Sequence, residues 1–231
     1  MRRREILAAL GATVSATVAA GGPAAAQRLP RVGVLVSGDP EPTWTLFRTA
    51  MADLGLVAGK TVIYEYRAAD SASGKLDAYA RELVALKVDV IVAVLSPATA
   101  AARQATSTIP IVFNGGATAT GVVTNVARPE GNITGAYGPS STLAGKGVQL
   151  LHGIVPGMKS VGLLLNANDP FHVPLLRDVE PVIRAEKLEM VALPIRAADE
   201  IAAAFDTMAA RGVGGALVQP SLGLQGTAAH A

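Results

Sequence analysis

Residues 88–106, VDVIVAVLSPATAAARQAT, pass from a strongly apolar run into a patch of small, mostly uncharged side chains. The apolar run at 89–95 has the length and composition of a buried β-strand, and the segment that starts at Pro97 is typical of a helix. This order indicates an α/β protein. It also leaves the start of the helix almost without side chains.

Strand and helix patterns alternate along the rest of the chain. Strands are predicted at 31–38, 60–68, 109–114, 131–137, 159–166, 188–195 and 214–220, and helices at 43–55, 73–87, 141–155, 171–187 and 198–212. Alternation of this kind predicts doubly wound, Rossmann-like units, in which a parallel sheet carries helices on both faces. The low aromatic content of 4% fits a core of Ala, Val, Leu and Ile.

The pattern divides into two series. We expect a first lobe at residues 30–137 and a second lobe at 138–221, followed by an irregular tail at 222–231. The second series offers about three strands where the first offers five. The second lobe is therefore expected to be incomplete.

The N-terminus predicts an exported protein. Residues 1–26 combine an arginine-rich head, a short apolar middle at 6–20 and a small-residue end, as a signal peptide cleaved near Ala26 does. The apolar part is too short for a membrane span. Arg3-Arg4 resembles the twin-arginine export motif, with general secretion and a retained amphipathic helix as the alternatives. The expected location is the periplasm.

Charge and cysteine content exclude several classes of protein. Removal of residues 1–26 takes away three of the 20 basic and one of the 18 acidic residues, so the mature chain is neutral. It therefore gives no support to a nucleic-acid partner. The chain has no cysteine, which excludes disulfides, thiolate metal sites and a lipoprotein anchor. We expect a monomer.

No enzyme signature is found. The glycines at 115, 116 and 121 do not form a dinucleotide-binding turn, and no G-x-S-x-G elbow is present. The three histidines, at 152, 172 and 230, lack the spacing of metal ligands. We therefore expect a protein that is not an enzyme and that needs neither a metal nor a cofactor.

The helix start at residues 96–100 is the best candidate for a binding site. In an open parallel sheet, ligands bind beyond the carboxyl ends of the strands. The first turn of a helix has unpaired N–H groups and a partial positive charge, which suit a carboxylate. Ser96 or Thr99 could add a hydroxyl donor. The alternative is that the small residues only allow the helix to pack closely on the sheet.

Several segments together resemble a known family. They are RVGVLVSG, ADLGLVAGKTVIYEYRAAD, LVALKVDVIVAVLSPATAAARQAT, IPIVF, VARPEGNITGAY, GKGVQLLHGIVPGMKSVGLLLN and ALVQPS, between residues 31 and 221. The chain resembles ABC transporter substrate-binding proteins, in particular TrpX-like members that bind tryptophan or tyrosine. The resemblance implies the type I periplasmic binding protein fold, with two hinged lobes that close on a small solute and deliver it to an ABC permease.

The resemblance also implies which residues contact the solute. In lobe 1 these are Ser37 and Gly38 after the first strand, the helix start at Ser96, Ala98, Thr99 and Ala100, and Asn114 and Gly115 after the fourth strand. Asn166 and Asn168 would face the solute from the other lobe. Tyr137, near the expected hinge, would either stack on the solute or pack the hinge.

The sequence departs from the family pattern in two places. Where the family commonly has an Asp-Pro pair, this chain has Gly116 and Ala117, so recognition of an ammonium group is weakened and an organic acid competes with an amino acid. The pattern also stops near Leu222, as in a truncated or frame-shifted chain. The alternatives are therefore a non-functional fragment of such a receptor or an exported Rossmann-type enzyme.

Overall fold

The computed structural model describes residues 28–38, 41, 43–69, 74–116, 120–125, 128, 131–136 and 140–223. The predicted signal peptide and Tyr137 lie outside the described residues. The elements are β1 (Arg31–Ser37), α2 (Thr43–Asp53), β2 (Ile63–Ala69), α3 (Lys75–Ala85), β3 (Val90–Val94), α4 (Ser96–Ala105), β4 (Ile111–Asn114), β5 (Ile133–Ala136), α5 (Ser140–Ile154), β6 (Ser160–Asn166), α6 (His172–Ala185), β7 (Glu189–Ile195), α7 (Glu200–Ala210), β8 (Gly215–Val218) and α8 (Pro220–Gly223).

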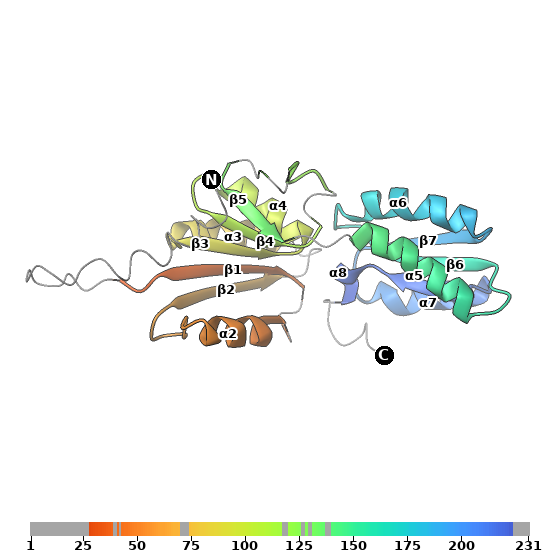
Figure 1. The fold of residues 1–231 in the computed structure, drawn as a ribbon, viewed down its shortest axis with the longest axis horizontal. Helices are drawn as coiled ribbons and strands as arrows, with labels where there is room; N and C mark the ends of the chain where they lie inside the picture. The colour runs from red at the N-terminus through yellow and green to blue at the C-terminus, as the bar shows by residue number, and fades with distance from the viewer. Residues whose placement is uncertain are drawn as a thin grey trace, which may run out of the picture.

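The strands form two parallel sheets that lie in two bodies, drawn side by side in Figure 1. The first sheet has the order β2-β1-β3-β4-β5, and we call it and its helices lobe 1. The second has the order β7-β6-β8, which repeats the arrangement β2-β1-β3, and it forms lobe 2 with α5 to α8. The predicted α/β class with doubly wound parallel sheets is confirmed.

Lobe 1 has apolar packing on both faces of its sheet. Successive side chains of a strand point to opposite faces, and in β1 one set, Val32, Val34 and Val36, packs with the aromatic residues of α2 and β2. Leu35 faces the other side, where α3 and α4 cover the sheet. Because helices cover both faces of the sheet, the strands are apolar along most of their length.

Lobe 2 repeats this design around β6. Val161, Leu163 and Leu165 pack with α5 and α6, whereas Leu164 packs with α7. Gly162 leaves room for α7, because a Cβ atom there would lie 2.5 Å from the sulfur of Met208. β6 is therefore buried along its whole length.

The last described segment differs from the sequence prediction. The tail from residue 222 was expected to be irregular, but Pro220–Gly223 form the helical turn α8. Leu222 is 1% exposed and packs with Ile201, Ala204 and Met208 in the core beneath α7. Tertiary burial stabilises a turn that is too short to show helical periodicity. No helix among the described residues is long and apolar enough to cross a membrane.

Candidate functional site

The carboxyl ends of the lobe 1 strands lie in register at one edge of the sheet. Ser37 is paired with Ala69, and Asn114 is paired with both Val94 and Ala136. The ladder continues one residue further, where Gly38 N–H donates to Ala69 O and Gly115 N–H donates to Ala136 O. The register therefore brings the predicted lobe 1 residues of β1, α4 and β4 to the same edge.

The turn from β3 into α4 holds a strained backbone. Leu95 has φ 70° and ψ 165°, a region that residues with a side chain rarely occupy. Its N–H donates to Asn114 O at 2.8 Å, so the strand pairing persists to the last residue before the helix. Gly115, with φ 133°, lies against it, since a Cβ atom at Gly115 would be 3.1 Å from Leu95 Cα. This close approach fixes where α4 begins.

The first amides of α4 are available to a ligand. Pro97 has no N–H, and the helical ladder starts with Thr99 N–H, which donates to Leu95 O at 3.1 Å. Among the described residues, none accepts a hydrogen bond from the N–H of Ser96 or of Ala98. These two groups and the helix dipole form a small donor site for an anion.

Only one of the two predicted hydroxyl donors remains. Thr99 Oγ1 donates to Leu95 O at 2.8 Å and is buried, so this geometry favours Ser96 over Thr99 as the hydroxyl that donates to a ligand. The hydroxyl reaches a carbonyl one turn back, as threonine in a helix commonly does. Ser96 Oγ has no hydrogen-bond partner among the described residues, and Ser96 is the hydroxyl donor at this helix start.

The alternative interpretation of the small residues also describes part of α4. Ala98, Ala101 and Ala102 are buried in the lobe 1 core, where their small size lets α4 pack closely on the sheet. Ala100 is half-buried. The alanine methyl groups therefore pack against the sheet, while the N–H groups of Ser96 and Ala98 are left to donate to a ligand.

At the carboxyl edge of lobe 2, the predicted asparagines are bound within their own lobe. Asn166 Oδ1 accepts from Asn168 N–H at 3.0 Å, and its Nδ2 lies 3.4 Å from Ser221 Oγ. Asn168 Nδ2 donates to Arg196 O at 2.7 Å. Asn166 ends β6 and Asn168 follows it, and these side-chain bonds shape the loop after the strand.

A buried polar network that the sequence pattern does not reveal surrounds these asparagines. Gln219 accepts from Asn166 N–H through Oε1 at 3.0 Å and donates through Nε2 to Asp169 Oδ2 at 2.9 Å. The other Asp169 oxygen accepts from Phe171 N–H. Burial raises the pKa of the Asp169 carboxyl, although the bonds from Phe171, Ser221 and Gln219 oppose this shift. The network ties the end of β8 to the loop that leads into α6.

The two lobes meet at these edges. In Figure 1, α8 lies at the end of lobe 2 that faces lobe 1. A Cβ atom placed on Gly116 would lie 2.5 Å from Phe171 Cδ2 and 3.1 Å from Ser96 Oγ. Gly116 and Ser96 belong to lobe 1 and Phe171 to lobe 2, so three residues from the two lobes converge on one point.

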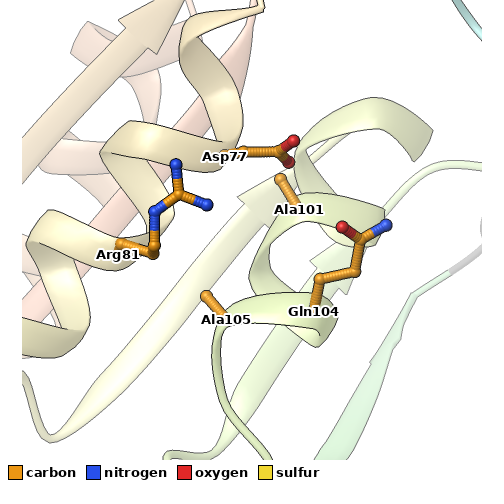
Figure 2. A pocket seen from close by; sticks show the side chains of 5 residues that line it. All are labelled: Asp77, Arg81, Ala101, Gln104 and Ala105. Atoms are coloured by element: carbon orange, nitrogen blue, oxygen red, sulfur yellow. The ribbon is translucent and has the colours of Figure 1, made fainter.

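Two surface hollows lie elsewhere, over the helices. One runs along α6 beside Glu180, Pro181 and Arg184. The other, of about 210 Å³, lies between α3 and α4 (Figure 2). It is lined by Ala101, Gln104 and Ala105 from α4 and by Asp77 and Arg81 from α3. It flanks the second half of α4, away from the donors at Ser96, so neither hollow belongs to the converging edges.

Comparison with known proteins gives the family. The model for ABC transporter substrate binding protein matches residues 32–222, which include both sheets and both carboxyl edges. The chain belongs to this family. Its members are solute-binding proteins and not a family of enzymes.

Individual family relatives support the fold. A tyrosine-binding protein of Clostridioides difficile is 26% identical over 125 residues, which are 53% of this chain and 36% of that protein. An ABC domain from Streptococcus pneumoniae in complex with L-Trp is 17% identical with a TM-score of 0.70, and the match covers 84% of this chain and 69% of that one. The two-lobed fold of type I periplasmic binding proteins is thus confirmed.

A third relative, a solute binding protein from R. palustris in complex with benzoate, is 15% identical with a TM-score of 0.58. The match covers 83% of this chain and 55% of that one. The chain thus spans little more than half of this relative and about a third of the tyrosine-binding protein.

The described part of this family member holds no metal-binding group. No three His, Cys, Asp or Glu side chains among the described residues are placed to share an ion. Two of the histidines make local contacts, since His152 Nδ1 lies 2.8 Å from Glu186 and His172 Nδ1 lies 2.8 Å from Asp169 O. Phe171, which lies where the two lobes meet, was not among the predicted residues.

Proposed function

We propose that this chain is the solute-binding component of an ABC importer and that it captures a small carboxylate-bearing solute between its two lobes. The observation that carries the proposal is the start of α4, where the N–H groups of Ser96 and Ala98 and the Ser96 hydroxyl lie together at the carboxyl edge of lobe 1. A carboxylate bound there would gain charge-assisted hydrogen bonds and the favourable end of the helix dipole.

Ser37, Gly38, Asn114 and Gly115 would border the solute from lobe 1, and the loop of Asn166 and Asn168 would approach it from lobe 2. Relatives bound to L-Trp and to benzoate support the proposal, because both ligands are carboxylates. Capture would proceed by hinge closure, with the solute stabilising the closed arrangement through contacts with both lobes.

The setting proposed for this activity is the periplasm. The predicted signal peptide at 1–26, of twin-arginine type, would direct export, and a permease in the inner membrane would accept the solute from the receptor. The proposed receptor acts as a monomer, without a metal, a cofactor or any catalysis of its own.

A pair of hydroxyl substitutions tests the proposed site. Isothermal titration calorimetry with a panel of small carboxylates and amino acids first identifies a ligand. Ser96→Ala is then expected to weaken binding by about 10- to 150-fold, as loss of a hydrogen bond to a charged group does. Thr99→Val is the control, because the Thr99 hydroxyl donates to Leu95 O. Absence of binding by the whole panel, or equal affinity of Ser96→Ala and the parent, would overturn the proposal.

A further inference from the structure

The point where the two lobes converge is occupied by an aromatic ring. The Cδ2 and Cε2 atoms of Phe171 would lie 2.5 and 2.9 Å from a Cβ atom on Gly116, and Ser96 Oγ would lie 3.1 Å from it. The ring of a lobe 2 residue thus reaches the rim of lobe 1 beside the Ser96 hydroxyl.

Gly116 is required because there is no room for a Cβ atom, and not because of its backbone conformation. Gly116 is absent from the residues with positive φ, whereas its neighbour Gly115 has φ 133°. The backbone at Gly116 therefore accepts alanine, but no Cβ atom tolerates an aromatic carbon at 2.5 Å. The absence of a side chain at this position is what allows Phe171 to approach.

Phe171 is held firmly within its own lobe. It is 5% exposed, and its N–H donates to Asp169 Oδ1 at 2.9 Å. Asp169 is in turn bound by Gln219. Its ring is part of the lobe 2 core beside Leu175 and Val179, so lobe 2 fixes the ring in the orientation that faces Gly116.

We propose that Phe171 is the specificity-determining residue of lobe 2: its ring contacts the body of the solute whose carboxylate is held at the start of α4, so the site favours planar, aromatic carboxylates. This inference rests on the proposed function. The ring and the Ser96 hydroxyl both lie against Gly116, so a solute whose carboxylate is bound by Ser96 would meet the ring with the rest of its body. Stacked and edge-to-face contacts favour an aromatic solute over an aliphatic one of similar size.

The charges at this point favour a solute without an ammonium group. An α-amino acid needs an acceptor for its ammonium, and Asp169 is the carboxylate nearest to Phe171 in sequence. Both Asp169 oxygens accept hydrogen bonds inside lobe 2, from Phe171 N–H and Gln219 Nε2. This carboxylate is therefore committed to the loop and is not free to accept an ammonium group, which favours an aromatic acid over an aromatic amino acid.

The test compares three probes of similar size: benzoate, cyclohexanecarboxylate and L-phenylalanine. Calorimetric dissociation constants are measured for the parent chain, Phe171→Leu, Gly116→Ala and the control Gly153→Ala. Leucine keeps most of the buried volume of Phe171 but lacks a flat ring. Gly153 has nothing within 4 Å of an added Cβ atom, so alanine there leaves the lobe contact intact.

The parent is expected to bind benzoate more tightly than either other probe. Phe171→Leu is expected to reduce the preference for benzoate over cyclohexanecarboxylate by about two- to tenfold. Gly116→Ala is expected to weaken benzoate binding because it displaces the ring, whereas Gly153→Ala binds like the parent. Thermal unfolding of each variant verifies that it is folded.

Two outcomes would overturn the inference alone. They are an unchanged ratio of benzoate to cyclohexanecarboxylate affinity in a folded Phe171→Leu, and tighter binding of L-phenylalanine than of benzoate by the parent. If the parent binds no carboxylate at all, the proposed function fails together with the inference. The three results are distinguishable.

Discussion

The carboxylate of Asp169 accepts a hydrogen bond from the side-chain amide of Gln219 at 2.9 Å, across 50 residues of sequence. Gln219 also accepts from Asn166 N–H, and it is 1% exposed. One buried amide thus satisfies a group at the end of β6 and a group on the loop that follows. The loop that carries Asn168 and Phe171 depends on it.

Replacement of Gln219 by leucine is expected to destabilise the protein. Leucine leaves Asn166 N–H and one Asp169 oxygen buried without these partners, at about 1–3 kcal/mol for each unsatisfied group. Urea unfolding should show a lower midpoint with an unchanged slope. The control is Gln149→Leu on the exposed side of α5, which is expected to change stability by about 0.5 kcal/mol or less. A Gln219→Leu midpoint equal to the parent's would show that the network has no energetic role.

The raised pKa of Asp169 predicts a pH dependence of stability. Because burial raises the pKa above its ordinary value of 3.8, the folded state binds this proton more tightly than the unfolded state does. The contribution of the protonated group is fully present below pH 3.8 and is lost as the pH rises through the folded pKa. The free energy of unfolding of the parent should therefore fall, relative to that of Asp169→Asn, as the pH rises through this window. A difference independent of pH would contradict this assignment.

Two lysines occupy left-handed backbone positions that favour glycine. Lys87 follows α3 with φ 53°, and Lys187 follows α6 with φ 58°. Lys187→Gly is expected to stabilise the protein by about 1 kcal/mol, because the left-handed conformation costs a residue with a Cβ about that much. Differential scanning calorimetry should show a melting temperature higher by about 2–4 °C.

The matched control for this change lies inside α5. Lys146→Gly places glycine in a helix and is expected to cost about 1 kcal/mol, so the two substitutions should move the melting temperature in opposite directions. If Lys187→Gly lowered the melting temperature instead, the contacts of the lysine side chain would contribute more stability than its left-handed backbone conformation costs.

The Gly115 turn is expected to tolerate no side chain. Gly115→Ala combines φ 133° with a Cβ atom 3.1 Å from Leu95 Cα, and it should cost about 1–3 kcal/mol. Gly153→Ala, within α5, should instead stabilise the protein by about 1 kcal/mol. Chemical unfolding of both variants measures the contrast. Equal stabilities would show that the turn relaxes freely.

The fold could be predicted because its signals are local. Apolar runs and helical periodicity mark each long element, and β1 through β8 appear in the predicted order. α8 could not be found in this way, because one turn has no period and is stabilised by the burial of Leu222. A short element of this kind depends on the tertiary structure around it.

The site could be predicted only as far as strand ends define it. The edge that gathers Ser37, Ser96 and Asn114 follows from parallel strands in register. The bond between Asp169 and Gln219 depends on the pairing of β6 with β8, which no local pattern encodes. The partner of the Thr99 hydroxyl likewise depends on the conformation of Leu95, an exception to ordinary backbone preferences.

β8 has a consequence for the behaviour of this protein in concentrated solution. In lobe 1, the equivalent strand β3 lies between two neighbours, whereas β8 pairs only with β6 among the described residues, and Val218 is 44% exposed. Its outer side offers a row of main-chain donors and acceptors next to apolar surface, a template on which an extended segment of another molecule can add. Self-association by strand addition at this border of lobe 2 is the expected consequence.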